Sequence, residues 1–407
     1  MPLTGRSCVP GSGAENTAGS QREYDGETMD ILGLRHQSSG VNSRFIGGGL
    51  SFAVYVQRTQ AMLRQVHDGD NEQEKIVAGN SPFELFPVDG FGEGRDKPYK
   101  RGILLTHGLT DSPYHMRHLA SFFQRQGFRV MAVLLPGHGT QPGDLLDVRW
   151  QEWAKAVQYG ADTLAAEVDD LYLGGFSTGA TLSVLQGGHD KRIRGMFLFS
   201  PAFEVDLRAK WANLHRLYSR FLPKEAWVNV MQDRDWYKYE SFCKNAAAQT
   251  YALTRALPRA DTKIPVFVAA SADDATVHAS ATLRFVYRAR HVGNRVVWYA
   301  TKKLDQQNIE WVNSALPEQR ILSSAHTAIV MPPSDPHYGA NGEYANCLHY
   351  YDDDKTSYHA CRAGGPETWL GEVTGPNLQR GIVRRLTYNP HYAALETSMR
   401  KFIDTLP

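Results

Sequence analysis

The central part of the sequence alternates short apolar runs with segments of helical periodicity, and this alternation limits the fold most strongly. The apolar runs, which we expect to be buried strands, are GILLTHG (102–108), RVMAVLL (129–135), LYLGGFS (171–177), GMFLFS (195–200) and PVFVAAS (265–271). Two helices are expected between them, at 113–128 with Pro113 in its first turn, and at 150–168. Continuous apolar strands separated by helices indicate an α/β fold with a mainly parallel sheet that helices cover on both faces.

Two segments interrupt the alternation. Residues 203–260 carry no strand signal and are rich in aromatic residues, so we expect a helical cap that lines an apolar pocket, or else a helical excursion that only packs on the body. Residues 331–388 are rich in Pro, Gly, Asp and Tyr. The expected organisation is a disordered leader (1–43), a first core part with an N-terminal extension (44–202), the cap (203–260), a second core part (261–330), an insertion (331–388) and a C-terminal core helix (389–407).

Charge and hydropathy exclude several classes of partner. With 44 basic and 43 acidic residues, the net charge of +1 gives no electrostatic reason to expect binding to nucleic acid or to an anionic membrane. We expect no transmembrane segment, because no apolar stretch approaches the length that spans a bilayer. The first residues lack the apolar core of a signal peptide, which slightly favours a cytoplasmic location.

Residues 171–182 read LYLGGFSTGATL and place Ser177 in a G-x-S-x-G pattern between an expected strand and an expected helix. In such a turn the serine adopts a strained backbone conformation, and small neighbours allow the adjacent chain segments to pack. The side chain then projects above the sheet edge, where a base can reach it. A glycine-rich turn without chemistry is the alternative, but the strand before the motif and the helix after it favour a nucleophile.

A second motif, LLTHGLTDSP (104–113), follows the first expected strand. Acyl transfer needs two backbone N–H groups directed at the oxygen that becomes negative. One comes from the residue after the nucleophile and the other from the loop after an earlier strand. This selects Thr178 and Leu109 as the oxyanion hole, and we interpret His107 as a structural residue that shapes the loop.

Four motifs occur in a characteristic order: THGLTDSP (106–113), LLPGHGTQPGDL (134–145), W-x-x-W (150–153) and GFSTG (175–179). In this order they resemble the carboxylesterase and monoacylglycerol-lipase (lysophospholipase-like) branch of the α/β-hydrolase superfamily. The resemblance is dense over 100–200 and returns at 261–278 and around 320–330. It implies an α/β-hydrolase fold with a helical cap insertion, and a structural role for His138 in the PGHG loop.

The resemblance also implies the chain order serine, acid, histidine. After the strand PVFVAAS the sequence continues ADDATVH (272–278). In the family the acid stands three residues before a Val or Ile, which selects Asp274 and leaves Asp273 as the alternative. A carboxylate there can accept a hydrogen bond from the histidine and hold its tautomer. His278 lies too close to the acid along the chain to be an attractive base.

The base is expected after the last strand, where RILSSAHTAIV (320–330) resembles the S-x-H ending of the family and selects His326. The chain between Asp274 and His326 is longer than expected, so we predict additional structure around TKKLDQQNIEWVNSALPEQ (301–319). His337 in SDPHYG is the alternative base, although its Pro and Gly neighbours indicate a turn.

The segment CLHYYDDDKTSYHAC (347–361) places Cys347, His349, His359 and Cys361 in a C-x-H…H-x-C pattern. Two sulfur and two nitrogen ligands suit zinc, but the spacing matches no familiar zinc signature. We favour a disulfide between the two cysteines, with free thiols as another alternative. The aspartates at 352–354 read as a solvated turn, and calcium is a weakly supported alternative for them.

These features predict a serine hydrolase that cleaves carboxylic esters through an acyl-enzyme, with Ser177, Asp274 and His326 as catalytic residues. The resemblance implies a small-molecule ester substrate: a short- or medium-chain acyl ester, a monoacylglycerol or a lysophospholipid. No metal or organic cofactor is expected. The same fold supports amidase, thioesterase, perhydrolase and carbon–carbon hydrolase chemistry, and a non-catalytic binding protein is a further alternative. The oligomeric state does not follow from the sequence.

Overall fold

A central sheet organises the computed structural model, which describes residues 32–88, 97–206, 222–258, 262–306 and 308–406. Within these residues the sheet has eight strands in the order β1-β3-β2-β4-β5-β8-β9-β10. The strands are β1 (Phe83–Leu85), β2 (Tyr99–Thr106), β3 (Phe128–Val133), β4 (Val168–Phe176), β5 (Ile193–Phe199), β8 (Val266–Ser271), β9 (Arg295–Ala300) and β10 (Ile309–Asn313). Every pair is parallel except β1 with β3, which confirms the expected α/β-hydrolase fold class.

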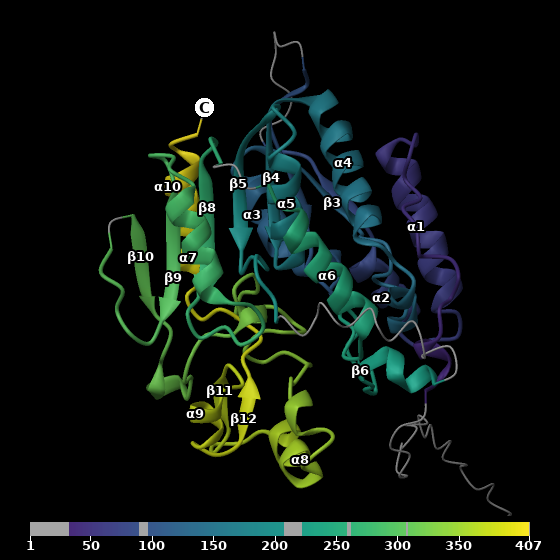
Figure 1. Ribbon diagram of the computed structural model, residues 1–407, viewed down its shortest axis with the longest axis vertical. Coiled ribbons are helices and arrows are strands. Elements are labelled where there is room, and N and C mark those ends of the chain that lie inside the picture. Colours follow the sequence, from purple (N-terminus) through teal and green to yellow (C-terminus); the bar gives the residue numbers. More distant parts are fainter. Residues whose placement is uncertain (1–31, 89–96, 207–221, 259–261, 307, 407) are drawn as a thin grey trace, which may run out of the picture. The chain divides into compact units, whose positions relative to one another are not determined.

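Helices cover both faces of this sheet (Figure 1). Alternate side chains on a strand point to opposite faces, and in β2 Leu104 belongs to one hydrophobic cluster whereas Ile103 and Leu105 belong to another. The helices on the Leu104 face are α1 (Phe52–Val66), α4 (Trp150–Glu167), α5 (Thr178–Gly187), α6 (Lys244–Ala256) and α7 (Ala279–Arg288). The helices on the other face are α3 (Arg117–Arg125) and α10 (Tyr392–Ile403).

The remaining helical segments are short or lie outside these two layers. Apart from two helices of the insertion, described below, they are α2 (Gln73–Asn80) and the 3₁₀ helices Leu34–His36, Pro113–Met116, Pro142–Leu146, Pro223–Ala226, Pro317–Gln319, His326–Ala328 and Leu348–Tyr350. The expected helix over 113–128 is therefore a 3₁₀ turn followed by α3, with Pro113 at the start of the turn as predicted.

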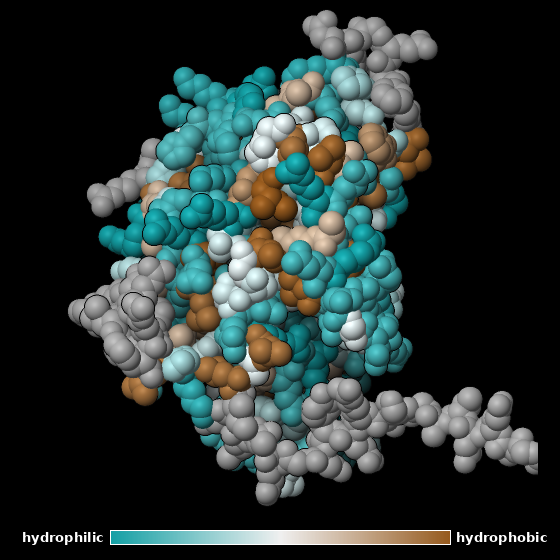
Figure 2. Space-filling view, turned by 90° about the vertical axis from the view of Figure 1, so that its right-hand side faces the viewer, coloured by the Kyte–Doolittle hydropathy of each residue, from teal (hydrophilic) through white to brown (hydrophobic). Residues whose placement is uncertain are grey.

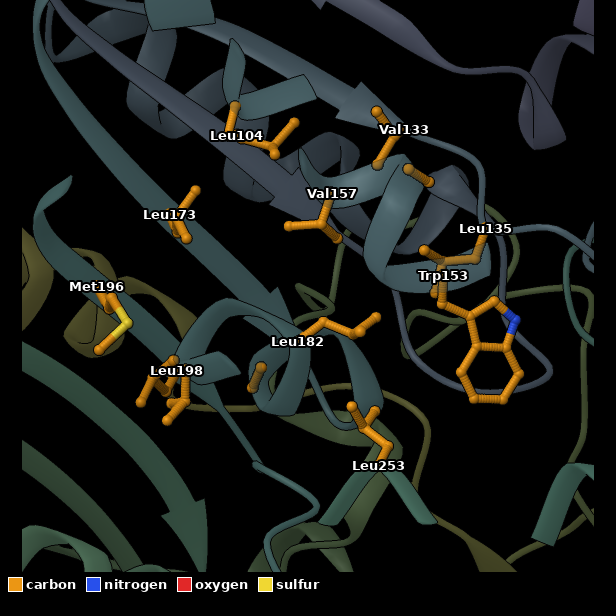
Figure 3. Packing of buried hydrophobic residues seen from close by; sticks show 14 of the residues in the cluster. Leu104, Val133, Leu135, Trp153, Val157, Leu173, Leu182, Met196, Leu198 and Leu253 are labelled. Carbon is orange, nitrogen blue, oxygen red and sulfur yellow. The ribbon is translucent and has the colours of Figure 1, made fainter. Parts of the chain in front are cut away.

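The cluster on the Leu104 face packs the nucleophile-bearing part of the sheet against α4 and α5. Figure 3 shows Leu104, Leu173 and Val157 close together at the centre of this interface, with Leu182 on α5 nearby. Trp153 is fully buried, and its indole N–H donates to the carbonyl of Pro136 at 2.9 Å. Truncating one of these buried leucines to alanine costs about 2–5 kcal/mol, so this packing holds the end of β4 in place.

Part of the segment expected to be a leader packs on the core. His36 and Asn42 are buried, and the Asn42 amide donates to the carbonyl of His138 at 2.8 Å. The hydroxyl of Ser39 donates to the Asp144 carboxylate at 2.8 Å. The expected boundary at residue 43 therefore falls inside an ordered segment that begins by residue 32, because its polar side chains bond to the loop after β3. Residues 1–31 lie outside the described part.

The segment 203–260 differs from the all-helical cap expected. It contains two short antiparallel strands, β6 (Trp227–Asn229) and β7 (Phe242–Cys243), among the described residues. Its helix α6 joins the core cluster beside α4 and α5, so this helix packs on the body. Two aromatic residues that the cap hypothesis relied on, Trp211 and Tyr218, lie outside the described residues.

The insertion 331–388 has its own elements, which gather below the lower ends of the strands in Figure 1. They are α8 (Lys355–Ala363), β11 (Trp369–Gly371), α9 (Gly375–Leu378) and β12 (Val383–Arg385). β11 and β12 form a parallel pair, and an isolated bridge joins Ile321 to Leu370. The insertion is thereby attached to the chain just before His326.

The surface shown in Figure 2 is mainly hydrophilic, with hydrophobic residues in small groups near its middle. Single or small apolar groups of this kind are usual on folded proteins. Among the described residues, no helix has both the length and the apolar character needed to cross a bilayer.

Candidate active site

Ser177 occupies a sharp turn between β4 and α5 at the carboxyl edge of the sheet. Its φ is 53°, a left-handed conformation that costs a non-glycine residue about 1–3 kcal/mol. The turn is held because the Ser177 N–H donates to the carbonyl of Phe199 at 2.9 Å. A Cβ atom at Gly175 would lie 2.3 Å from the carbonyl carbon of Gly179, and one at Gly179 would lie 2.1 Å from the carbonyl oxygen of Thr106. Both glycines of the motif are therefore required by close packing of backbone.

The structure brings Ser177, His326 and Asp274 together. The His326 Nε2 atom lies 2.9 Å from the Ser177 hydroxyl oxygen, and its Nδ1 atom lies 2.6 Å from a carboxylate oxygen of Asp274. Burial alone would raise the pKa of Asp274, but the charge and hydrogen bond of His326 outweigh burial and lower it. An ionised carboxylate at this distance favours the histidine tautomer that carries its proton on Nδ1, and in that tautomer the unprotonated Nε2 faces the Ser177 hydroxyl.

The neighbouring Asp273 has a different partner. It accepts a hydrogen bond from the Ser314 hydroxyl at 2.7 Å, and burial raises its pKa. Asp274, in contrast, also accepts bonds from the backbone N–H groups of Thr276 and Val277, at 2.8 and 3.0 Å. Of the two aspartates, Asp274 is therefore the one aligned with His326.

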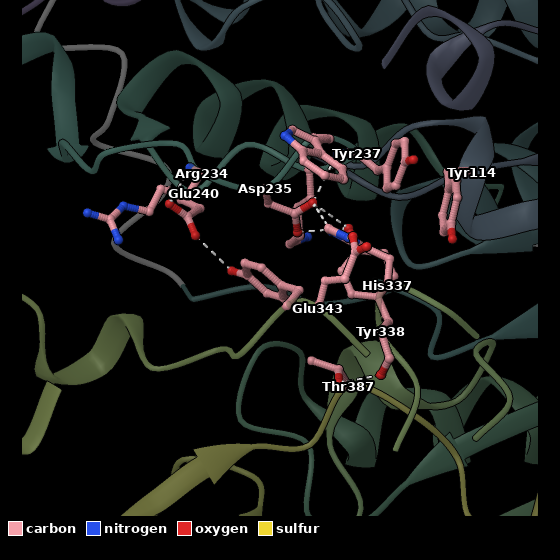
Figure 4. Close-up of polar contacts among 12 residues, drawn as sticks. Tyr114, Arg234, Asp235, Tyr237, Glu240, His337, Tyr338, Glu343 and Thr387 are labelled. Atoms are coloured by element: carbon pink, nitrogen blue, oxygen red, sulfur yellow. Dashed lines mark hydrogen bonds and ion pairs between the residues drawn. The ribbon is translucent and has the colours of Figure 1, made fainter. Parts of the chain in front are cut away.

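The alternative base, His337, belongs to a separate polar cluster (Figure 4). Its Nε2 atom lies 3.0 Å from the carboxylate of Asp235, which also accepts a bond from the Tyr338 hydroxyl at 2.8 Å. The ring of Trp236 stacks on the His337 ring at 5.4 Å between centroids. His337 thus joins the 234–240 segment to the insertion, and its contacts do not include Ser177.

Leu109 and Thr178 both line the cavity in front of Ser177. Leu109 lies in the loop after β2, and Thr178 is the first residue of α5. Among the hydrogen bonds of the described residues, none uses the backbone N–H of either residue. The loop that carries Leu109 is fixed from the 234–240 segment, because the Tyr239 N–H donates to the carbonyl of Thr110 at 2.8 Å. Two free backbone donors beside a serine are the arrangement needed to stabilise an oxyanion.

A buried ion pair adds to the hold on this loop. Asp111 is 1 % exposed and pairs with the Lys238 ammonium group. Burial opposes the ionisation of Asp111, but Lys238 and nearby His115 outweigh it and lower its pKa to about 2. Lys238 was missed at the sequence level, since no local pattern relates it to Asp111.

His107 and His138 occupy buried positions behind the site. The Leu135 N–H donates to His107 Nε2 at 3.0 Å, and His107 Nδ1 lies 2.8 Å from the carbonyl of Gly108. Burial lowers the pKa of His138 to about 4, and its Nδ1 atom contacts the Pro136 carbonyl at 3.1 Å. The His107 ring thus bonds to the loops after β2 and β3, and the His138 ring to the loop after β3.

The cavity in front of Ser177 has a volume of about 690 Å³. Its walls come from three parts of the chain: the core loops, the segment 203–260 and the insertion 331–388. The apolar residues that line it are Leu109, Ala202, Val205, Val228, Met231, Phe242, Ala247, Val277, Leu348 and Val373. The polar residues of the last two parts are Asp206, Asn229, Lys238, Glu240, Thr250, Asn346, His349, Asp352, Asp353 and Arg385. The contribution of the insertion was not expected from the sequence.

The cysteines of the C-x-H…H-x-C segment form a disulfide, Cys347–Cys361. The disulfide removes both thiolates that a zinc site would need. Among the described residues, no three His, Cys, Asp or Glu side chains come close enough together to hold a metal ion. The disulfide joins α8 to the start of the 3₁₀ turn 348–350, which lines the cavity.

Two curated proteins are similar to part of this chain. The chain is 29% identical over 137 residues to a thermostable monoacylglycerol lipase of Bacillus sp. (strain H-257), covering 33% of this chain and 50% of that protein. It is 29% identical over 97 residues to a carboxylesterase of Bacillus subtilis (strain 168), covering 24% of this chain and 39% of that protein. The matches thus span half or less of the length of these relatives.

Solved structures with partial likeness carry similar names. One is a structure described under the names LipS and LipT, two metagenome-derived lipolytic enzymes. Its TM-score is 0.45 at 22% identity, and the match covers 54% of this chain and 87% of that chain. Another is a monoacylglycerol lipase of Paleococcus ferrophilus, with a TM-score of 0.40, 18% identity, and coverage of 50% and 86%.

A family model matches a longer part of the chain than either of the two Bacillus relatives does. The model of the family described as serine aminopeptidase, S33, matches residues 97–303, about half of the chain. The matched part contains the turn of Ser177, both expected oxyanion residues and Asp274, while His326 follows it. The chain therefore belongs to this family, and its fold is that of the α/β-hydrolases.

Proposed function

We propose that this protein hydrolyses carboxylic esters, with Ser177 as nucleophile, His326 as general base and acid, and Asp274 as the residue that orients His326. The observation that carries the proposal is the continuous chain of short contacts from Asp274 through His326 to the Ser177 hydroxyl, inside a cavity large enough for a small molecule. The geometry fits the requirement that a nucleophile and its base lie within hydrogen-bond distance.

In the first half of the reaction, the Ser177 oxygen attacks the acyl carbon while His326 Nε2 takes the serine proton. The N–H groups of Leu109 and Thr178 stabilise the oxyanion of the tetrahedral intermediate. His326 then gives its proton to the departing alcohol oxygen as the acyl–oxygen bond breaks, and an acyl-enzyme remains. In the second half, His326 takes a proton from water, whose oxygen attacks the acyl carbon, and Ser177 is released with its proton restored.

The cavity lining supports an ester with an apolar acyl group and a small polar alcohol. Its apolar side chains suit an acyl chain, and its charged and amide side chains suit hydroxyl groups. The relatives named monoacylglycerol lipase and carboxylesterase point to the same chemistry. Short- or medium-chain acyl esters, monoacylglycerols and lysophospholipid-like esters are the proposed substrate class.

The test is hydrolysis of p-nitrophenyl esters with acyl chains of increasing length, together with a glycerol monoester. The wild-type protein should turn over at least one of them, and Ser177→Ala should lose about 10³-fold or more in kcat. The matched control is Ser183→Ala, which changes a buried serine of α5 that bonds to the Gly179 carbonyl. A p-nitroanilide in the panel measures amidase activity. No turnover of any ester, or equal turnover by Ser177→Ala, would show that the proposal is wrong.

A further inference from the structure

A buried carboxylate of the insertion contacts both loops that carry the expected acid and base. Glu372 is 0 % exposed and immediately follows β11. One of its carboxylate oxygens accepts the backbone N–H of His326 at 3.0 Å and that of Ala275 at 3.4 Å. Ala275 is the residue after Asp274. A single side chain thus bonds to the loop of the acid and to the loop of the base.

Glu372 is itself held on several sides. The Arg385 Nε atom lies 2.7 Å from one carboxylate oxygen, and an Nη atom donates to the other at 3.0 Å. The backbone N–H of Glu372 donates to the Ser323 hydroxyl oxygen at 3.0 Å, in the same loop as His326. The register of the small sheet explains the pairing, because Gly371, the residue before Glu372, pairs with Arg385.

Arg385 extends the connection to the acid. Its guanidinium donates to the Thr276 hydroxyl at 2.6 Å, and the Thr276 backbone N–H donates to Asp274. The negative charge of nearby Asp274 is one of the causes that raise the pKa of Arg385. Both Glu372 and Arg385 lie in the 331–388 insertion, beyond the residues 97–303 that the family model matches.

From these contacts we propose that Glu372, held by Arg385, is a positioning residue for the reaction at Ser177. It fixes the backbone of His326 relative to the backbone next to Asp274, and so maintains the spacing of the two side chains. Glu372 does not line the cavity, so its effect reaches the substrate through the residues it holds: His326, Asp274 and its partner Arg385, which does line the cavity. The inference rests on the proposed function, and it gives the insertion a role in catalysis besides walling the cavity.

The experiment compares Glu372→Ala and Glu372→Gln with the wild type, using p-nitrophenyl butyrate for steady-state kinetics. Active sites are counted with diethyl p-nitrophenyl phosphate, which transfers its diethylphosphoryl group to an activated serine and releases p-nitrophenolate. Counting sites separates slower catalysis from a smaller folded fraction. The control is Glu167→Gln, which removes one partner of the buried Arg129 on the opposite part of the sheet.

A displaced catalytic group can cost about 100-fold in rate, so we expect Glu372→Ala to lower kcat per active site by roughly 30- to 100-fold. KM should stay within about threefold, because Glu372 does not line the cavity and Arg385, which does, keeps its bond to the Thr276 hydroxyl. Glu372→Gln keeps an acceptor oxygen at the same reach, so it should retain more activity than the alanine variant. The rate of diethylphosphorylation should fall in parallel with kcat, and Glu167→Gln should leave both unchanged.

Thr276→Val gives a further readout that does not disturb the buried pair. Thr276 is exposed, and the variant removes only the hydroxyl that Arg385 bonds, so kcat should fall several-fold. Values of kcat per active site within twofold of wild type, for Thr276→Val and for whichever Glu372 variants fold, would overturn the positioning role. A wild-type protein that neither hydrolyses esters nor reacts with the phosphate would instead refute the proposed function itself.

Discussion

Replacing Lys238 with methionine removes the cation that neutralises Asp111 beside the loop of Leu109. In the wild type the pKa of Asp111 is about 2, against an ordinary value of 3.8. At about 1.36 kcal/mol per pKa unit, the folded environment stabilises the carboxylate by roughly 2 kcal/mol. Without Lys238, only the weaker contributions of His115 and His107 remain against the cost of burying the carboxylate, so the loss of stability exceeds this figure. Breaking a buried pair by removing one partner costs about 3–5 kcal/mol, which is the decrease we expect in the free energy of unfolding at pH 7.

The pH dependence gives the sign of the effect. In the wild type the depressed pKa of Asp111 stabilises the fold above pH 3.8, and this contribution is lost as the pH falls toward 2. In Lys238→Met the uncompensated burial raises the pKa of Asp111 in the folded state. Protonation of Asp111 at low pH then stabilises the folded variant, and this stabilisation is lost as the pH rises through the raised pKa. The difference in free energy of unfolding between wild type and variant should therefore be largest at neutral pH and decrease on acidification.

The assay is guanidinium unfolding followed by tryptophan fluorescence at pH 7 and pH 5. The double variant Lys238→Met/Asp111→Asn should recover most of the lost stability, because it no longer buries an unpaired charge. As a matched control, Lys244→Met removes a partly exposed pair with Glu225 and should cost less than about 1 kcal/mol. A loss below about 1 kcal/mol for Lys238→Met, or a double variant no more stable than the single one, would refute this reasoning.

Three further predictions follow from particular contacts. Gly179→Ala should prevent folding of the Ser177 turn, because its Cβ would lie 2.1 Å from a backbone oxygen. As a control, Gly375→Ala places its Cβ where no heavy atom lies within 4 Å, so the thermal unfolding midpoint should stay nearly unchanged. Serine at both positions of the 347–361 disulfide should lower the free energy of unfolding by about 3 kcal/mol, the chain-entropy value for a loop of this length, and equal stability of the oxidised wild type and the variant would contradict it. His326→Gln should lower kcat about 10³-fold or more, whereas His337→Gln should keep kcat per active site near wild type. The opposite result would identify His337 as the base instead of His326.

The sequence predicted those features that depend on local pattern. The apolar runs correspond to β2, β3, β4, β5 and β8, because buried parallel strands need continuous apolar side chains. The extra structure predicted at 301–319 is also present, as β10 lies in this segment and extends the sheet beside β9. That strand explains the long chain between Asp274 and His326. β9 itself was not predicted, although RVVWYA is a buried β-rich run.

Long-range pairs left no signal in the sequence. Lys238 meets Asp111 across 127 residues, and Glu372 bonds to the His326 backbone across 46 residues. Neither pair has a spacing that indicates contact, because tertiary packing alone brings the partners together. The same reason applies to the insertion. Its cysteine spacing favoured the 347–361 disulfide, which the structure contains, but nothing in its sequence indicated that its residues line the cavity. Proline and glycine content identified the insertion as irregular without indicating where it packs.

Covalent labelling of the nucleophile tests the central claim most directly. The protein is treated with diethyl p-nitrophenyl phosphate and digested, and the modified peptide is sequenced by mass spectrometry. The proposed chemistry predicts one diethylphosphoryl group per chain, located on Ser177, with ester hydrolysis lost in proportion to labelling and no label on Ser177→Ala. Ester hydrolysis that persists after full reaction, or a label on a different residue that accounts for the inhibition, would contradict the assignment of Ser177 as the nucleophile.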